Sequence, residues 1–219
     1  IIFRQGLTTL CVPLSIKNQV KHMNEIIITK RKGKFPIIKT NRLILRDIEV
    51  KDITPEYIKW LNDPKVNIYL DIGLVLQTEE MVREFIKEKL KNTKDTKHFG
   101  VYDNRGTRLV GTVTLPTIEW YHHCGEISFV IGHPDARRKG YATEALQGVI
   151  NYLFTCCGLI KLWAGYKEGN IASAHVLEKN GFKEEGRLTK KYLNYKNERV
   201  DHVLVGLLAD DYLRSSIHH

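Results

Sequence analysis

The stretch Arg137-Arg138-Lys139-Gly140-Tyr141-Ala142 lies between an apolar run, 127–131, and a segment with helical periodicity. A strand, a short basic turn and a helix start, in this order, present backbone N–H groups to the oxygens of a phosphate. Gly140 fits this interpretation, because a side chain at that position would hold a phosphate away. The stretch therefore predicts a cradle for a pyrophosphate. From residue types alone, an ordinary basic turn between a strand and a helix is the alternative.

The segment after the basic turn has the pattern of an amphipathic helix over 142–154. Its apolar residues recur at offsets of three and four, which places them on one helical face: Ala142, Ala145, Leu146, Val149, Ile150, Leu153 and Phe154. The N-terminus of this helix falls at the basic turn. Its unpaired amides and partial positive charge favour an anion there.

The motif Arg137-x-x-Gly140-x-Ala142 resembles the Q/R-x-x-G-x-G/A signature of the GCN5-related N-acetyltransferases. The preceding GEISFVIG, residues 125–132, is similar to that family's fourth strand. The later GNIASAHVLEKNGF, residues 169–182, resembles the N-x-x-S…K-x-G-F segment of the branch that includes ribosomal-protein alanine N-acetyltransferases. With the opening TNRLILR, residues 40–46, and the closing 201–208, the resemblance covers about 37–212.

This resemblance implies an α/β fold: a single mixed, mostly antiparallel central sheet flanked by helices. It also implies acetyl-CoA as co-substrate, with direct transfer of the acetyl group to a primary amine of a small molecule, such as an amino sugar, or of a protein N-terminus. The strand before the turn would pair with pantetheine and supply an oxyanion donor from a backbone N–H near Val130. The implied cofactor-binding residues are Phe129, Val130, Ile131, Arg137, Arg138, Lys139, Gly140, Tyr141, Ala142, Thr143, Asn170 and Ser173.

Acetyl transfer to an amine needs a base, an oxyanion donor and a proton for the departing thiolate, because a primary amine has a pKa of roughly 8 to 10. The resemblance implies Glu126 as the base and Ser173 as the proton donor. A carboxylate that holds a turn is the alternative for Glu126, and helix capping is the alternative for Asn170 and Ser173. Tyr166 and Tyr192 are rival hydroxyl donors.

Acceptor specificity is expected in the loop WLNDPKVNIYL, residues 60–70, and in the last hairpin. This loop resembles the corresponding sequence of relatives that acetylate amino sugars, surface-polysaccharide precursors or protein N-termini. The predicted substrate-binding residues are Trp60, Asn67, Tyr69 and Glu126, although Trp60 and Tyr69 equally fit a role as core anchors. A second function class is a non-catalytic acyl-CoA-sensing or RNA-associated module, and the presence of both Glu126 and Ser173 argues against it.

The composition sets further bounds. The chain carries 34 Lys and Arg against 25 Asp and Glu, a net charge of +9. Without an aromatic-interleaved basic stripe, we do not expect nucleic-acid binding. No apolar run approaches the roughly 20 residues that span a bilayer. The cysteines lack metal-ligand spacing, which predicts no metal site and a reducing, cytoplasmic location: Cys11, Cys124, Cys156 and Cys157. A homodimer is left open.

We expect an N-terminal extension over 1–36 with Met23 as the natural start, one domain over 37–212, and a tail over 213–219 that is the remnant of a tag. Periodicity predicts a first strand through Ile38, Leu43 and Leu45. A helix over 78–91 is expected to bury a stripe of Met81, Phe85, Ile86 and Leu90. Further helices are expected over 55–61 and 173–180, strands over 97–102, 108–115, 126–131 and 159–166, and a hairpin over 182–208.

Overall fold

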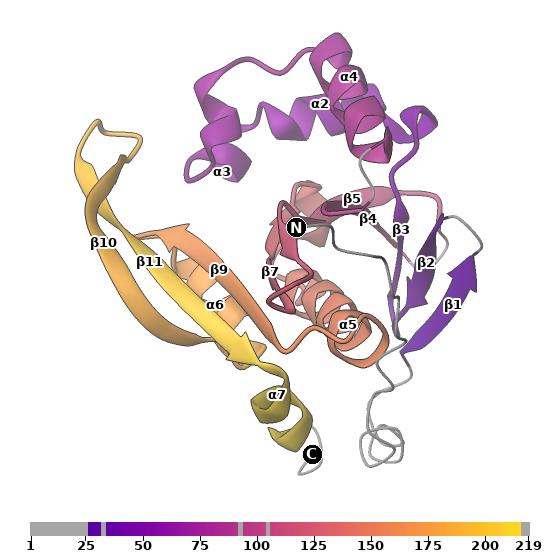
Figure 1. The fold of residues 1–219 in the computed structure, drawn as a ribbon. Helices are drawn as coiled ribbons and strands as arrows, with labels where there is room; N and C mark the ends of the chain where they lie inside the picture. The colour runs from indigo at the N-terminus through magenta and orange to yellow at the C-terminus, as the bar shows by residue number, and fades with distance from the viewer. Residues whose placement is uncertain (1–25, 32–33, 92–93, 104–105, 216–219) are drawn as a thin grey trace, which may run out of the picture.

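The computed structural model describes residues 26–31, 34–91, 94–103 and 106–215 (Figure 1). The expectations about Met23, Cys11 and the tag remnant at 217–219 lie outside these residues. The strands are β1 (Ile27–Arg31), β2 (Lys34–Lys39), β3 (Leu43–Asp47), β4 (Lys97–Asp103), β5 (Leu109–Leu115), β6 (Ile118–Glu119), β7 (Cys124–Glu126), β8 (Ser128–Ile131), β9 (Lys161–Lys167), β10 (Lys183–Leu193) and β11 (Arg199–Leu208). The helices are α2 (Pro55–Leu61), α3 (Pro64–Asn67), α4 (Glu79–Lys91), α5 (Tyr141–Cys156), α6 (Ile171–Lys179) and α7 (Ala209–Ser215), with short 3-10 turns η2 (Val50–Asp52), η3 (Asp71–Leu74) and η4 (Pro134–Ala136).

The strands form two sheets, which confirms the α/β class but replaces the single sheet that we expected. One has the order β1-β2-β3-β4-β5-β8, and the other has the order β10-β11-β9-β7-β6. Among the described strands, β7 and β9 form the only parallel pair. In Figure 1, β9, β10 and β11 curve away from the first sheet, while α5 lies beside both. The two sheets are therefore halves of one fold that part near β7 and β8.

The predicted continuous strand over 126–131 is wrong, because the chain changes sheets within it. Glu126 ends β7, which pairs with β9, and Ser128 begins β8, which pairs with β5. Ile127 stands between them with its side chain buried, and its N–H donates to Trp163 O at 2.9 Å. An apolar run signals burial on both faces but says nothing about which neighbour each half pairs with.

The first predicted strand is also divided. A turn at Thr40, whose N–H donates to Leu43 O at 3.0 Å, separates β2 from β3, and the two strands pair antiparallel. The sheet already starts at Ile27 with β1, and α7 continues to Ser215. Alternation along 38–45 suggested one element because both strands direct their apolar residues to the same core.

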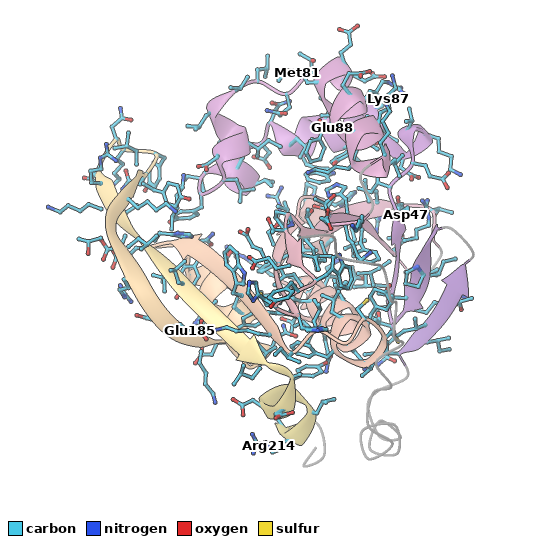
Figure 2. All side chains as sticks on the ribbon, in the orientation of Figure 1. Asp47, Met81, Lys87, Glu88, Glu185 and Arg214 are labelled. Atoms are coloured by element: carbon cyan, nitrogen blue, oxygen red, sulfur yellow. The ribbon has the colours of Figure 1, made fainter. Side chains whose placement is uncertain are left out.

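Helix α5 forms the centre of the main core, as its periodicity predicted. Ala145, Leu146, Val149, Ile150 and Leu153 are all fully buried, and they pack with apolar residues of both sheets. In Figure 2, side chains fill the space between this helix and the strands around it. Burying each of the Leu, Val and Ile side chains stabilises the fold by about 1.5–3 kcal/mol. The helix is therefore a fixed base for the turn at its N-terminus.

The expected stripe on the helix over 78–91 is wrong in part. Val82 and Ile86 are the residues that α4 buries, whereas Met81 is 45% exposed and lies on the outer side in Figure 2. Phe85 and Leu90 are exposed as well. Val82 and Ile86 pack into a small buried cluster with residues of α2 and its flanking loops: Ile48, Ile53, Tyr57, Trp60 and Leu61. Phe85 contributes an edge contact to the His98 ring at 5.5 Å.

Cys124, Cys156 and Cys157 are not joined in disulfides within the described part of the chain. Within the described ranges, no three His, Cys, Asp or Glu side chains gather as metal ligands. The helices of these ranges are all too short or too polar to cross a membrane.

Gly132 joins the small cluster to the turn after β8, and we predict that it admits no side chain. A Cβ at this position would overlap the indole ring of Trp60. Gly132→Ala should therefore lower the free energy of unfolding by about 1–3 kcal/mol, as overpacking does elsewhere. Gly186→Ala in β10 is the matched control, because a Cβ there would meet open space. Equal losses for both variants in urea titrations would contradict this packing.

Candidate active site

The basic turn before α5 has an unusual backbone. Arg138 has a φ of +59° and Gly140 a φ of +76°, so two left-handed residues lie within three positions. Gly140 is the N-cap of α5, and no side chain caps the helix there. The first amides of α5, at 141–143, therefore stay available to an anion, and left-handed residues in a turn add further convergent N–H groups. This geometry fits the predicted cradle.

Arg137 has another task than the one expected for a cradle residue. Its guanidinium donates to Gly132 O at 2.6 Å and pairs with Asp63 at 2.9 Å. The backbone N–H of Arg137 donates to Pro134 O. The hydrogen bond from Arg137 lowers the pKa of the Asp63 carboxyl below its usual value. Arg137 thus braces the turn against the loop before α3 and leaves the anion to the amides that follow it.

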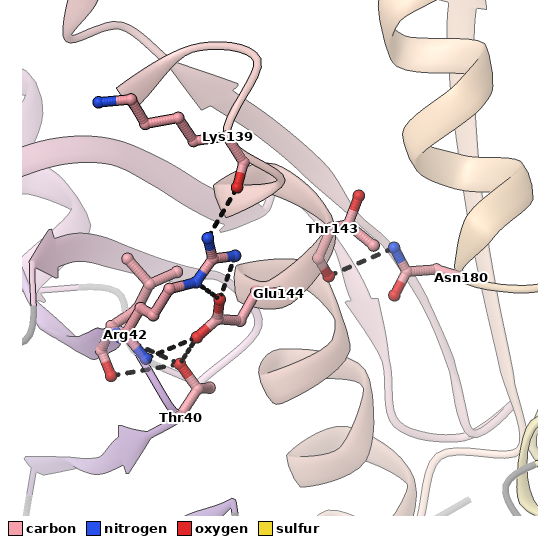
Figure 3. A network of polar contacts seen from close by, with 7 residues as sticks. Thr40, Arg42, Lys139, Thr143, Glu144 and Asn180 are labelled. Atoms are coloured by element: carbon pink, nitrogen blue, oxygen red, sulfur yellow. Dashed lines mark hydrogen bonds and ion pairs between the residues drawn. The ribbon is translucent and has the colours of Figure 1, made fainter. Parts of the chain in front are cut away.

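A second brace holds the start of α5 from the other side (Figure 3). The Glu144 carboxylate accepts from Thr40 Oγ1 at 2.6 Å, from Arg42 N at 2.8 Å and from Arg42 Nε at 2.6 Å. The Arg42 guanidinium also donates to Lys139 O at 2.8 Å. Sequence reasoning missed Arg42 and Glu144 because about a hundred residues separate them. Beside this network lies a pocket of about 340 Å³.

The edge of β8 that faces away from β5 has no strand partner in the described part of the chain. Gly132 N–H donates to Val110 O, and the groups of an antiparallel strand alternate in direction. The backbone groups of Val130 therefore face β5, whereas those of Phe129 and Ile131 face the open side. The predicted pantetheine-binding strand thus offers Phe129 and Ile131, and the amide of Val130 itself is directed elsewhere.

Strand β9 has a matching open edge. It pairs with β11 from Lys161 to Lys167, but with β7 only as far as Trp163. Beyond that point, residues 164–167 have no described strand on the β7 side. Two open edges therefore begin at the Ile127 crossing, one on each sheet. Unpaired backbone groups of this kind bind an extended polar ligand readily.

Glu126 lies at the base of this divergence. It stands opposite Trp163 in the parallel register, so both side chains project from the same face of the sheet. Because side chains alternate along a strand, Gly165 and Lys167 of β9 lie on this face too. Burial raises the pKa of the Glu126 carboxyl above its usual value, and the positive charge of Lys191 opposes that rise. A half-buried carboxylate with a raised pKa is suited to accept a proton near neutral pH.

The face that carries Glu126 continues towards the β10–β11 hairpin through Gly165, Lys167, Tyr192 and His202. Lys167 Nζ pairs with Asp71 at 2.8 Å and lies 5.2 Å from the centroid of the Tyr192 ring. The Tyr192 ring meets the His202 ring at 4.9 Å and 76°. Gly165 leaves room for the His202 imidazole, which a Cβ there would overlap. The sequence carried no signal for His202, because only strand pairing brings it beside Gly165 and Lys167 of β9.

The predicted proton donors fall in different places. Asn170 Oδ1 accepts from the backbone N–H of Ser173 at 3.2 Å, so Asn170 does cap α6, while Ser173 contributes only its backbone to this cap. The Ser173 hydroxyl forms no hydrogen bond to another described residue. Tyr192 shares the face of Glu126, whereas Tyr166 alternates with Gly165 and projects from the opposite face. Tyr166 is therefore separated from Glu126 by the sheet.

The predicted acceptor loop also divides into two groups. Trp60 is only 3% exposed and packs on Gly132, and Asn67 Nδ2 donates to Leu61 O at 3.0 Å within the loop. Tyr69 is half-buried and reaches the turn at Gly169, just before α6. Trp60 and Asn67 thus shape the loop, and Tyr69 lies beside the end of β9.

Comparison with known proteins identifies the family. The model described as "Acetyltransferase (GNAT) domain" matches residues 42–183. The chain belongs to the GNAT acetyltransferases. It is 31% identical over 165 residues to the uncharacterized N-acetyltransferase YoaA of Bacillus subtilis, covering 74% of this chain and 90% of that one. A solved acetyltransferase of the GNAT family from Bacillus anthracis matches with a TM-score of 0.68 and 30% identity, over 80% of this chain and 99% of that one.

The spermidine N(1)-acetyltransferase of Vibrio cholerae is 28% identical over 117 residues, covering 53% of this chain and 66% of that one. Several relatives thus carry the name N-acetyltransferase. This GNAT member is accordingly an N-acetyltransferase that uses acetyl-CoA as its co-substrate and an amine as acceptor. The prediction of an enzyme is confirmed over that of a non-catalytic module.

Gly140 gives the first test of the cradle. Gly140→Val should weaken acetyl-CoA binding by at least about tenfold, because a β-branched residue resists a φ of +76° and displaces the first amides of α5. Calorimetric titration of the purified variant measures this change.

Gly158, at the other end of α5, provides the control. It has a φ of +72°, and a Cβ there would meet open space. Gly158→Val should carry a comparable backbone strain of roughly 1–2 kcal/mol but leave acetyl-CoA affinity unchanged. If both variants bound acetyl-CoA equally well, the cradle would be misplaced.

Proposed function

We propose that acetyl-CoA binds with its pyrophosphate at the amides of 138–143 and its pantetheine along the open edges of β8 and β9. The acceptor amine then approaches from the face that carries Glu126. The observation that carries this proposal is that β8 and β9 diverge at Ile127. Glu126, the residue before Ile127, lies where the two strands part. The uncapped start of α5 supports the placement of the pyrophosphate.

The proposed reaction is direct transfer. The amine nitrogen forms a bond to the thioester carbon, and the carbon–sulfur bond breaks. Glu126 accepts the proton of the amine, directly or through water, and Ser173 donates a proton to the departing thiolate. The oxyanion donor is a backbone N–H of β8, and alternation favours Phe129 or Ile131 over Val130.

An acetyl-enzyme is disfavoured by the state of Cys124, the cysteine nearest to Glu126 in sequence. Burial and the nearby Glu119 raise the pKa of the Cys124 thiol. Since the thiolate is the nucleophilic form, a raised pKa makes Cys124 a weak candidate. We therefore propose that the amine attacks the thioester directly, without an acetyl group on Cys124.

Both acceptor classes predicted from the sequence remain in this proposal: a small-molecule amine and a protein N-terminus. The segment 169–182 supports the second through its resemblance to the ribosomal-protein branch. The described cysteines, which form no disulfide, support the proposal of a cytoplasmic enzyme. Release of CoA from acetyl-CoA with a panel of amino sugars, polyamines, aminoglycosides and free-N-terminal peptides tests the function. Tight CoA binding without thiol release for any amine would contradict it.

The role of Glu126 predicts a defined pH dependence. The base must be ionised, so kcat/KM should fall as the pH drops through the pKa of Glu126, which burial places above the usual carboxyl range. Glu126→Gln should lower kcat by about a hundredfold and remove this acidic limb. A variant that kept both its rate and the acidic limb would show that Glu126 holds the turn and is not the base.

The proton donor is tested by comparing two hydroxyl deletions. Ser173→Ala should lower kcat about tenfold or more at unchanged acetyl-CoA affinity. It preserves the α6 cap, because that bond uses the backbone N–H of Ser173. Tyr192→Phe should have a smaller effect on kcat. The reverse order would assign the proton to Tyr192.

A further inference from the structure

The face beside Glu126 contains one lysine whose position depends on an irregularity in β10. Leu188 pairs with His202, and Tyr192 pairs with Val200, so residues 189–191 stand opposite the single residue Asp201. Bulges of this kind re-aim a side chain next to active sites.

Two observations show that specific contacts stabilise this bulge and that it redirects a side chain. Lys190 has a φ of +51°, a costly conformation for a residue with a Cβ, and its N–H donates to Asp201 Oδ1 at 2.8 Å. Ordinary alternation would place Lys191 and Tyr192 on opposite faces, but Lys191 Nζ lies 4.9 Å from the centroid of the Tyr192 ring. The bulge therefore brings Lys191 onto the face of Glu126.

The charges on this face differ in how they are compensated. Lys167 is neutralised by Asp71 at 2.8 Å. Lys191 forms no ion pair with any carboxylate of the described ranges, yet its charge acts on both Glu126 and His202. Burial lowers the pKa of His202 below its usual value, which favours the neutral imidazole. Among the described residues that the contacts place on this face, Lys191 is thus a positive charge without a carboxylate partner.

We propose that the preferred acceptor is an amine that also carries an anionic group, a phosphate ester or a carboxylate, which Lys191 binds while the amine faces Glu126. The inference rests on the proposed function, because it assigns the acceptor side to this face. A lysine is a point charge that suits either anion. A polyamine such as spermidine would instead bring its spare positive charges against Lys191 and be disfavoured.

Matched pairs of acceptors test this preference. Glucosamine 6-phosphate with glucosamine is the phosphate pair, and glycyl-aspartyl amide with glycyl-asparaginyl amide is the carboxylate pair. Spermidine is the cationic member. The wild-type enzyme should show a kcat/KM at least about tenfold higher for one anionic member than for its neutral partner and for spermidine, with the difference mainly in KM. The pair that responds identifies the anion.

Lysine variants connect the preference to Lys191. In Lys191→Met the ratio between the anionic and neutral partners should fall to about one, and Lys191→Glu should shift preference towards spermidine. Lys196→Met is the matched control, because Lys196 lies on the same hairpin and 5.7 Å from the neighbouring Tyr195 ring, and it should retain the ratio. Rates are compared above the acidic limb, since removing the charge of Lys191 raises the pKa of Glu126.

Three results would overturn the inference or its basis. A wild-type enzyme that acetylates spermidine or the neutral partners at least as well as both anionic acceptors contradicts it. Equal effects of Lys191→Met and Lys196→Met on the ratio also contradict it. If none of the acceptors supports thiol release from acetyl-CoA, the proposed function itself is contradicted, and the inference with it.

Discussion

The crossing of the chain at Ile127 is the constraint on which the rest of the site depends. The Ile127 side chain is buried and its N–H donates to Trp163 O, and the two sheets part at this residue. Beyond it, β8 continues with β5 and β9 continues with β11, so each leaves one edge open. Unpaired strand edges are costly when water is excluded, and an extended ligand with its own amides satisfies them. The proposed ligand site is therefore a consequence of sheet topology.

The turn at Gly140 depends on restraints from distant parts of the chain. Glu144 and Arg42 tie the first turn of α5 to the β2–β3 turn, while Arg137 and Asp63 tie the preceding residues to the loop before α3. Asn180 Nδ2 adds a bond to Thr143 O at 3.4 Å from the end of α6. These contacts hold the amides in place before a ligand arrives, which lowers the ordering cost of binding. The side chains at this end of α5 thus hold the backbone of the turn in position.

The sequence was sufficient where structure follows from local pattern. The apolar face of α5, the helix over 55–61 and the hairpin that ends at Leu208 all follow from periodicity and from residues that stop an element. The Arg137-x-x-Gly140-x-Ala142 motif predicted the turn and the helix start for the same reason, since both are local features, and the cradle stays a prediction.

Contacts that depend on strand pairing could not be predicted. No local signal shows that the chain changes sheets at Ile127, that Glu144 meets Arg42, or that Gly165 makes room for His202. The position of Lys191 needs a bulge that is defined only by the register of two strands. Arg137 is the converse case, because a motif suggests a contact with the ligand and the packed structure uses the side chain as a brace.

The open edge of β8 is tested most directly by amide hydrogen exchange, resolved by NMR for individual residues, with and without CoA. If pantetheine lies along this edge, the amides of Phe129 and Ile131 should gain protection on binding. The amide of Val130 should change little, because it already faces β5. Unchanged exchange at Phe129 and Ile131 in the saturated complex would contradict the role of the crossing at Ile127 in building the site.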